Sequence, residues 1–291
     1  MRVFLRCLII IVVSILTNCS SPNRTSAVIK EKRIISLSPH ITEIIYALGA
    51  DKDLVAVTSY CQYPLQAREK EKIGGLFDPN IEKIVNLSPT HLFGIPAHFK
   101  LNQDLTRFNL HVLMLPDETV SDVFNTIDTL GRILGYENQA RNIITNIRNE
   151  LQQLHDKNKQ HQPVTAILVI GKEPGSLQNL MLAGSNTFLN ELWTLVGGIN
   201  SFADLPVRYS AVNLESIIQR NPQVIIQFDT NRPGGIYIGE QESSWQVLKD
   251  IAAVKNRNIY TIGGDYVFIP GPRLILLAQN FSTLINQLAG E

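Results

Sequence analysis

The sequence predicts an α/β fold of two lobes, in which parallel-type sheets flanked by helices are joined by one long backbone helix. Short β-like runs alternate with helical patterns on both sides of residues 137–160, which is typical of parallel α/β sheets. A unit of capped helix, proline and buried strand occurs once in each half, at residues 80–95 and 213–228. Two copies are too few for a solenoid, so they indicate two equivalent lobes.

The predicted connecting helix covers residues 137–160. Its apolar positions are separated by steps of three and four, which places them on one face of an α-helix. They are Ala140, Ile143, Ile144, Ile147, Leu151 and Leu154. Gly135 ends the preceding helix, and Pro163 prevents this one from continuing. A long surface helix within a single domain would show the same periodicity.

The first half alternates strands with helices. We expect strands at 33–37, 54–58, 91–95 and 111–115, and helices at 42–48, 81–87 and 121–134. Thr42 and Asn80 are suitable N-caps for the first two helices. Ligands of such sheets bind beyond the carboxyl ends of the strands, which is where Tyr60 and the loop at 74–79 lie.

The second half has the same alternation. We expect strands at 165–170, 224–228 and 259–262, and helices at 186–196, 213–220, 245–254 and 272–289. In the repeated unit, Glu82 and Glu215 hold matching places in the first turn of matching helices. The helix dipole favours an acid there by a few tenths of a kcal/mol, so both could be simple solvated charges. The alternative is that the two carboxylates, one on each lobe, contact a partner with basic residues.

Composition excludes several classes of protein. A chain of 291 residues with 44% hydrophobic and 18% charged residues is globular rather than disordered. Its 26 basic residues balance 26 acidic ones, so there is no basic field for nucleic acid and no polybasic membrane patch.

The N-terminus has the pattern of an export signal. Arg2 and Arg6 precede a short apolar run, and residues 16–19, Leu-Thr-Asn-Cys, are similar to a bacterial lipobox. We therefore expect a signal peptide at 1–18, lipid on Cys19 and a flexible tether at 19–32. An ordinary secretory signal cleaved nearby is the alternative, and either one exports the protein. Cys61 is then a lone thiol, so no disulfide framework is expected.

Several aromatic side chains follow predicted strands or lie in loops between helices and strands. They could line a pocket for a large, flat, apolar ligand. They are Tyr60, Tyr63, Phe77, Tyr209, Tyr266 and Phe268. Some of these are expected to belong to the core, Phe77 and Phe268 first.

Four stretches resemble the ABC-transporter substrate-binding proteins for iron complexes and vitamin B12, and within that family the vitamin B12-binding branch is the most similar. The stretches are Ile35–Pro39 with Thr42-Glu43, Ser59–Pro64, Asn80–Glu82 and Pro272-Arg273. The resemblance covers about residues 33–289. It implies the class III periplasmic-binding-protein architecture, with a first lobe at 33–136, an interlobe helix at 137–160 and a second lobe at 161–291.

The resemblance also implies roles for particular residues. Tyr60 would contact the ligand from the first lobe, and residues 265–269 would form the binding stretch of the second. That stretch consists of Asp265, Tyr266, Val267, Phe268 and Ile269. Tyr209 would occupy another aromatic position, and Glu82 and Glu215 would dock on arginines of the permease. The chain departs from the vitamin B12 branch at Leu76 and Ile95, which replace tryptophans, and at Val267, which replaces an aromatic residue.

The resulting expectation is a monomeric, lipid-anchored solute-binding protein on the outside of the membrane. It would capture a cobalamin-like corrinoid and deliver it to an importer made of permease and ATPase, with no resident cofactor or metal. A ferric siderophore or haem is the alternative ligand, with Arg208, Arg232 and Lys100 as candidate cations. A lipid-anchored adhesion module is the alternative of another class.

Metal binding and catalysis are weaker alternatives. The six histidines show no close His-x-x-His spacing, and His98 is the best candidate for touching a ligand. The sequence contains no Gly-x-Ser-x-Gly, Walker loop or His-Glu-x-x-His motif, and Cys61 has no adjacent base, so we expect no enzyme.

Overall fold

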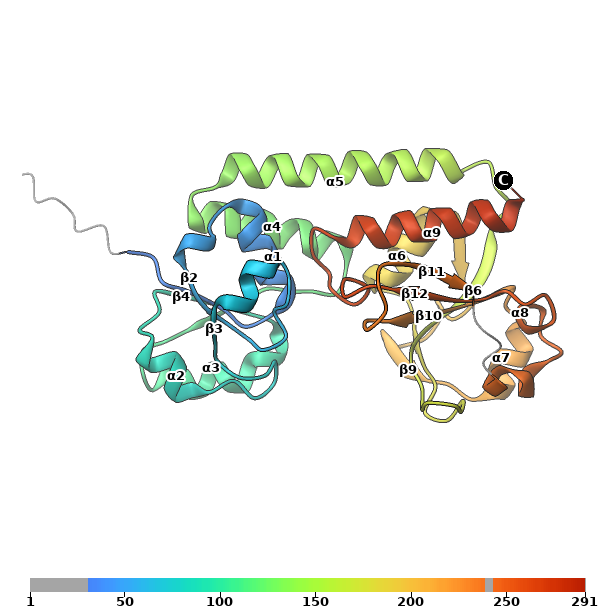
Figure 1. The fold of residues 1–291 in the computed structure, drawn as a ribbon, viewed down its shortest axis with the longest axis horizontal. Helices are drawn as coiled ribbons and strands as arrows, with labels where there is room; N and C mark the ends of the chain where they lie inside the picture. The colour runs from blue at the N-terminus through green and yellow to red at the C-terminus, as the bar shows by residue number, and fades with distance from the viewer. Residues whose placement is uncertain (1–30, 239–242, 291) are drawn as a thin grey trace, which may run out of the picture. The chain divides into compact units, whose positions relative to one another are not determined.

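The computed structural model describes residues 31–238 and 243–290 (Figure 1). The predicted signal peptide, Cys19 and the tether up to residue 30 lie outside the described residues. From Lys32 onward the chain forms one compact unit. Within the described residues, no helix combines the length and apolar character needed to cross a membrane.

Strands and helices alternate along this unit. The strands are β1 Ile34–Ser36, β2 Leu54–Val57, β3 Glu71–Lys72, β4 His91–Gly94, β5 Val112–Met114, β6 Val164–Gly171, β7 Met181–Ala183, β8 Gly198–Asn200, β9 Tyr209–Ala211, β10 Val224–Asp229, β11 Gly235–Ile238 and β12 Ile259–Gly263. The α-helices are α1 Pro39–Leu48, α2 Ile81–Asn86, α3 Phe99–Thr106, α4 Val120–Leu134, α5 Glu137–Asn158, α6 Phe188–Leu195, α7 Leu214–Arg220, α8 Ala252–Lys255 and α9 Leu274–Ala289. Short 3-10 segments occur at Asp51–Asp53, Leu65–Glu69, Pro96–His98 and Ser243–Leu248.

The first lobe is built on a fully parallel sheet with the strand order β3-β2-β1-β4-β5. The second lobe has a mixed sheet with the order β11-β12-β10-β6-β7-β9, and β8 also pairs with β6. Its centre, β12-β10-β6, is parallel, but β7 runs antiparallel to β6 and β11 antiparallel to β12. No helical crossover lies between β6 and β7, so the chain turns back on itself there. The predicted α/β class with two lobes is confirmed, and the mixed edges refine it.

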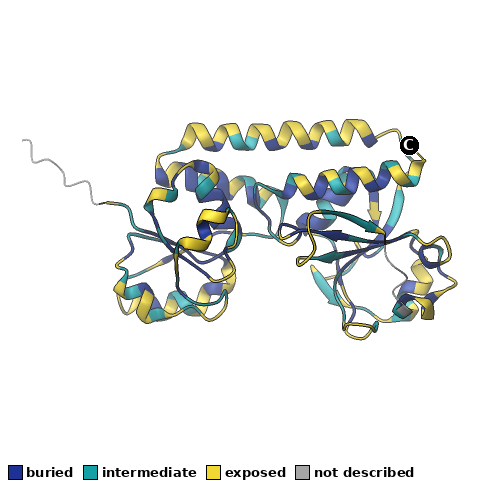
Figure 2. Cartoon of the chain, viewed as in Figure 1, coloured by how far each residue is buried: buried dark blue, intermediate teal, exposed yellow. Residues whose placement is uncertain are grey.

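Helix α5 joins the two lobes, as predicted (Figure 1). Of its six predicted apolar positions, Ala140, Ile147 and Leu151 are buried, and the other three pack partly buried against the same core. This core is continuous and includes side chains from α1 and α4 as well as α6 and α9. The opposite face of α5 is exposed (Figure 2). Because one core runs beneath α5, the helix ties the two lobes together.

The repeated unit is the same structure in both lobes. Asn80 caps α2 by accepting a hydrogen bond from the backbone N–H of Lys83, 2.9 Å away, and Asn213 caps α7 by the same bond from Ser216. Each helix is followed by a strand of the sheet, β4 or β10. The internal similarity therefore reflects equivalent local structure, with the N-caps in the predicted places.

Two predicted helices differ from the structure. The first begins at Pro39 rather than at Thr42, because proline is well suited to the first helical position. Thr42 lies inside the helix, where its hydroxyl donates to Ser36 Oγ at 2.8 Å. The helix expected at 245–254 is divided into the 3-10 segment Ser243–Leu248 and α8. Asn221 Oδ1 accepts the backbone N–H of Ala252 and so starts a new helix there.

Candidate functional site

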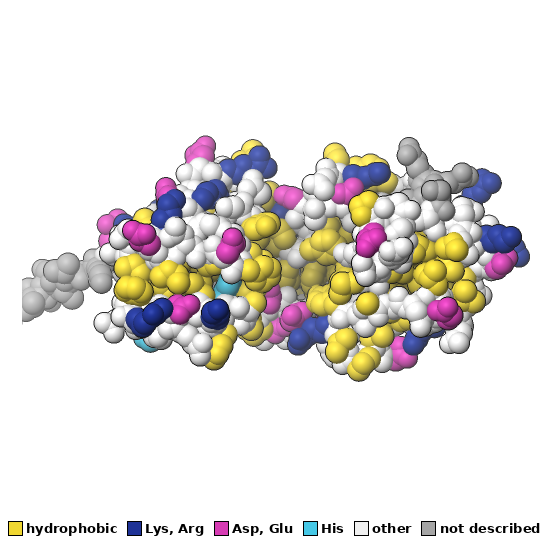
Figure 3. Space-filling view, turned by 90° about the horizontal axis from the view of Figure 1, so that it is seen from below, with side chains coloured by type: hydrophobic (Ala, Val, Ile, Leu, Met, Phe, Trp, Pro, Cys, Tyr) yellow, Lys and Arg dark blue, Asp and Glu magenta, His cyan; other side chains and the backbone are white. Residues whose placement is uncertain are grey.

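A cleft of about 510 Å³ lies between the two lobes and is lined by both. The first lobe contributes Pro39, Glu43, Ser59, Tyr60, Gln62, Tyr63 and Leu76, and the second contributes Thr230, Asn231, Asp265, Phe268, Ile269 and Arg273. Most of these residues follow the carboxyl ends of β2, β10 and β12, where parallel sheets bind ligands. Seen from the side opposite α5, hydrophobic side chains gather along both walls of the hollow between the lobes (Figure 3).

Large apolar side chains are left open to solvent at this cleft. Tyr60, in the turn after β2, is 62% exposed, and Phe268, after β12, is 38% exposed. The Phe268 ring is held edge-on against Phe228 with 5.5 Å between centroids, so it is supported from behind while it faces the cleft. Exposed aromatic rings on opposite lobes are suited to a flat apolar ligand placed between them.

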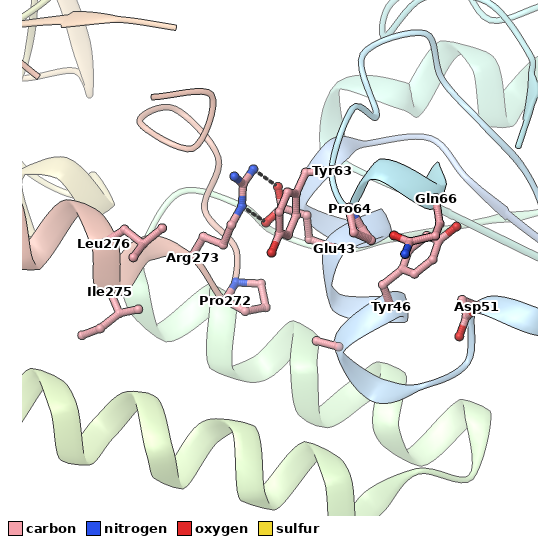
Figure 4. A pocket seen from close by; sticks show the side chains of 11 residues that line it. Glu43, Tyr46, Asp51, Tyr63, Pro64, Gln66, Pro272, Arg273, Ile275 and Leu276 are labelled. Atoms are coloured by element: carbon pink, nitrogen blue, oxygen red, sulfur yellow. Dashed lines mark hydrogen bonds and ion pairs between the residues drawn. The ribbon is translucent and has the colours of Figure 1, made fainter. Parts of the chain in front are cut away.

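A buried ion pair crosses between the lobes and forms one wall of the cleft. Arg273, just before α9, binds Glu43 of α1 with two hydrogen bonds, Nε to Oε2 at 2.9 Å and Nη2 to Oε1 at 2.6 Å (Figure 4). The remaining Nη1 binds Asp265 at 2.6 Å. The guanidinium also lies 3.8 Å from the ring centroid of Tyr63. These contacts fix both the distance and the orientation of the lobes at the site.

Burial and pairing perturb the acidity of this pair. Burial raises the pKa of Glu43, and the hydrogen bonds and charge of Arg273 offset only part of that effect. Burial lowers the pKa of Arg273, but its bonds to Glu43 and Asp265 outweigh burial and raise it. Among the described residues that line the cleft, Arg273 is the one cation, and Glu43 and Asp265 already occupy it. With both carboxylates ionised, the lining therefore carries a net charge of about −1.

His98 holds one of the loops that line the cleft. Its Nδ1 accepts the backbone N–H of Ile95 at 3.0 Å, so Nε2 is the protonated nitrogen and donates to the carbonyl of Leu76 at 2.7 Å. Burial lowers the pKa of this imidazole, which keeps it neutral. Because both ring nitrogens are occupied and the side chain is buried, His98 positions the Leu76 loop rather than contacting a ligand. The same loop turns at Gly74, whose φ of 106° favours glycine.

The second-lobe stretch divides into cleft and core residues. Asp265, Phe268 and Ile269 line the cleft. Tyr266 and Val267 are buried, and Tyr266 Oη accepts a hydrogen bond from Asn280 in α9 at 2.8 Å. Their side chains thus hold the loop in place from behind. The expectation that Phe268 is among the most buried aromatics is wrong, since Phe228 covers only one side of it.

Phe77 and Tyr209 are not among the residues that line the cleft. Phe77 is 75% exposed, so the expectation that it is buried is wrong; its loop projects the ring into solvent. Tyr209 is the first residue of β9 and is half-buried. It lies next to Asp117 and Glu118, the acidic residues just before α4. Burial and the charges of Glu118 and Asp117 raise the pKa of Tyr209 to about 12. Burial, with the charges of Glu118 and Asp122, raises the pKa of Asp117 to about 6.

The remaining candidates also lie outside the cleft lining. Arg208 is 3.8 Å from Glu118, Arg232 is 3.3 Å from Asp229, and Lys100 is exposed on α3. Cys61 is buried, and its sulfur lies within hydrogen-bond distance of the Thr42 hydroxyl, at 3.1 Å, so it is a structural thiol. Within residues 31–238 and 243–290, no three His, Cys, Asp or Glu side chains are placed to hold a metal ion.

Glu82 and Glu215 are both exposed, each in the first turn of the helix capped by Asn80 or Asn213. Helices α2 and α7 lie on the side of their lobes away from α5 (Figure 1). The side chains of Glu82 and Glu215 are open to solvent.

Sequence reasoning missed several residues of the cleft. Thr230 and Asn231 gave no signal, because polar loop residues are common everywhere. Gln62, Glu43 and Arg273 entered only as part of the family resemblance. A local signal existed for Glu43, since a charged residue in the apolar run Ile41–Ile45 of an amphipathic helix must find a partner if it is buried.

Comparisons with known proteins agree with this geometry. Residues 34–266 match the family described as periplasmic binding protein. The vitamin B12-binding protein of Vibrio cholerae is 28% identical over 257 residues, which cover 88% of this chain and 89% of that protein. YvrC of Bacillus subtilis, named an uncharacterized ABC transporter substrate-binding lipoprotein, is 28% identical over 252 residues, covering 84% of this chain and 76% of that protein.

Solved structures show the same fold. The crystal structure of the periplasmic vitamin B12 binding protein BtuF of Vibrio cholerae has a TM-score of 0.74 at 28% identity, covering 89% of this chain and 98% of that one. The periplasmic heme binding protein HutB of Vibrio cholerae has a TM-score of 0.75 at 24% identity, covering 87% and 98% of the two chains. The latter likeness concerns the fold alone.

Proposed function

Because this chain belongs to the periplasmic binding protein family, as an ABC-transporter substrate-binding protein of its vitamin B12 and iron-complex group, we propose that it captures a cobalamin-like corrinoid. Proteins of this family are exported, bind small ligands and work with a permease and an ATPase; they are not enzymes. The ligand is cargo, so no resident cofactor is proposed. The described chain would act as a monomer.

The observation that carries the choice of ligand is the cleft itself, with exposed Tyr60 and Phe268 on opposite lobes. A corrin ring is large and mostly apolar, and it would be held by these faces together with hydrogen bonds from polar groups such as Gln62 and Asn231. The vitamin B12-binding relative of Vibrio cholerae supports the same choice. Leu76 in the cleft wall leaves more room there than a tryptophan would.

Charge argues against the alternative ligands. Haem carries two propionates, and many ferric siderophores are anions, whereas the lining of this cleft has a net charge of about −1 and a cation already bound by two carboxylates. The cations Arg208, Arg232 and Lys100 do not line the cleft. An anionic chelate would therefore meet uncompensated repulsion. A neutral or weakly cationic chelate would not.

Calorimetric titration of the purified protein with cyanocobalamin, and separately with haemin, tests this choice. We expect saturable binding of cyanocobalamin at one site per chain and much weaker binding of haemin. Haemin binding in preference to cyanocobalamin would contradict the proposal and favour the haem alternative. A pink or red colour of the protein as purified would identify a chelate that remains bound from the cell.

Two further assignments belong to the same proposal. Cys19 would carry the lipid that anchors the chain at the cell envelope, which the sequence at residues 16–19 and the name of the Bacillus subtilis relative support. Glu82 and Glu215 would dock on basic residues of the permease, which their equivalent exposed positions support. Mass spectrometry of the protein extracted from membranes tests the first, because an unmodified Cys19 would exclude the anchor.

A further inference from the structure

A groove of about 320 Å³ lies on the second lobe, between α7 and the segment that leads into α8. It is lined by Ile218 and Asn221 on one side and by Val247, Leu248, Asp250 and Ile251 on the other. None of these residues lines the ligand cleft, so the groove is a separate feature of the surface.

Hydrogen bonds between its two sides hold the groove in shape. Asn221 ends α7, and its side chain accepts the backbone N–H of Ala252 at 2.7 Å. The backbone N–H of Ala253 donates to the carbonyl of Pro222 at 2.9 Å. Because these bonds tie the end of α7 to the start of α8, the groove is already formed in the free protein, and binding there orders little of the chain.

The apolar side chains of the groove differ in their exposure. Leu248 and Ile251 are buried and form its floor, whereas Ile218 is 53% exposed and Val247 is 67% exposed at its edges. Neighbouring exposed apolar side chains over an apolar floor make a continuous patch, and such patches mark sites of protein interaction.

An acidic residue belongs to each side of the groove. Asp250 lines it, and Glu215 lies three residues before Ile218, on the same face of α7. Among the described residues neither carboxylate forms an ion pair, and Arg220, at the end of the same helix, is bound by Asp204. The charges therefore favour a partner whose apolar side chain has basic neighbours.

The first lobe has the same order of residues in its copy of the repeated unit. Glu82 and Val85 of α2 match Glu215 and Ile218 of α7, and Val85 is half-buried. Both helices lie on the side of their lobes away from α5 (Figure 1). An acid with an apolar neighbour is thus presented twice on one side of the molecule, where one large partner can contact both lobes.

We propose that the groove is part of the surface that docks on the permease, where it takes a large apolar side chain that the permease presents next to basic residues. The inference rests on the proposed docking of Glu215 and adds an apolar contact to it. Removing Ile218 and Val247 from water stabilises the complex, and the basic neighbours pair with Glu215 and Asp250. Because exposed ion pairs contribute little, the apolar contact supplies most of the affinity at this end.

Site-specific photocrosslinking in intact cells tests the proposal. The photoreactive residue p-benzoylphenylalanine replaces Val247 in the groove, Asn86 on α2 near Glu82, or Ile199, which is 48% exposed but does not line the groove. Mass spectrometry identifies the cross-linked proteins. We expect the permease subunit of an ABC importer to be cross-linked from positions 247 and 86, but not from position 199.

A substitution tests the apolar contact itself. Ile218→Arg places a cation against the basic residues of the permease, so it should lower the yield of permease cross-linked from position 86 roughly tenfold. Ile199→Arg is the matched control and should leave that yield unchanged. Unfolding by urea checks that both variants keep the stability of the unaltered chain.

Several outcomes would overturn the proposal. One is a permease cross-linked from position 86 but not from 247, which would leave docking by the acids without the groove. Another is a cross-link from 247 to a second copy of this chain, which would make the groove a dimer contact. A third is an unchanged yield after Ile218→Arg, and a fourth is no permease cross-linked from either position, which would also exclude the docking of Glu82 and Glu215.

The corrinoid assignment is tested separately. Cyanocobalamin titrated into the purified Ile218→Arg protein should bind as it does to the unaltered chain, because Ile218 does not line the cleft. The titration requires no permease, and the cross-linking requires no knowledge of the ligand. Failure of the docking groove and failure of the corrinoid assignment are therefore distinguishable.

Discussion

Removing Arg273 should destabilise the protein far more than an exposed ion pair would predict. The Glu43 side chain is 2% exposed and that of Arg273 is 13% exposed, so Arg273→Ala leaves a largely buried carboxylate without its partner. Breaking a buried pair in this way costs about 3–5 kcal/mol, whereas exposed pairs contribute about 0–1 kcal/mol. Asp265 also loses its partner, but it is half exposed and water replaces the bond.

A double-mutant cycle isolates the pair from the other losses. The free energy of unfolding by urea is measured for the unaltered chain, Arg273→Ala, Glu43→Gln and the double variant. In the Glu43→Gln variant, removal of Arg273 leaves no buried charge without its partner. Arg273→Ala should therefore lower the free energy of unfolding by only about 1–2 kcal/mol there. Equal costs of Arg273→Ala in both backgrounds would refute the reasoning, because the two side chains would then act independently.

The cost should also depend on pH. Burial raises the pKa of Glu43, and loss of Arg273 removes the effect that opposes it. A carboxyl with a raised pKa in the folded state binds more protons there than in the unfolded chain, so stability falls as pH rises above the unfolded pKa. The destabilisation by Arg273→Ala should therefore be larger at pH 8 than at pH 5. A constant difference between these pH values would contradict the assignment of the stranded charge to Glu43.

Three further predictions address other sites. Tyr60→Ala should weaken cyanocobalamin binding by about 1–3 kcal/mol while Tyr60→Phe, which keeps the ring, should not; equal calorimetric affinities would place Tyr60 outside the site. Glu82→Arg with Glu215→Arg should leave ligand binding intact and abolish uptake by whole cells, because like charges would meet at the permease, whereas Glu150→Arg on α5 should not; unchanged uptake would exclude docking there. The pKa of Asp117 is about 6, so Asp117→Asn should raise stability by about 1–2 kcal/mol at pH 7 and lose that gain towards pH 4, and denaturation curves with no such trend would exclude a buried acid.

Local rules were enough to predict most of the helices and strands of the fold. The N-caps Asn80 and Asn213, the helix end at Gly135 and the apolar stripe of α5 are determined by neighbouring residues, and the structure has them where the sequence placed them. The second lobe's antiparallel edges could not be foreseen, because β7 and β11 are too short to show a pattern. The division of the helix at 245–254 depends on Asn221, about thirty residues away.

The site could be predicted only in part, because its key contact is long-range. Glu43 and Arg273 are 230 residues apart, and no periodicity links them. Tyr60 and Phe268 could be placed after strands, but their exposure depends on which neighbours cover them in the folded chain. Tyr266 is in the core because Asn280 lies behind it on α9, a contact that no motif encodes.

A crystal structure of the protein with cyanocobalamin tests the central claim most directly. We predict that the corrin lies in the interlobe cleft between Tyr60 and Phe268, with the Glu43–Arg273 pair intact behind it. A corrin bound elsewhere, or a cleft that stays empty at saturating cyanocobalamin, would contradict the account.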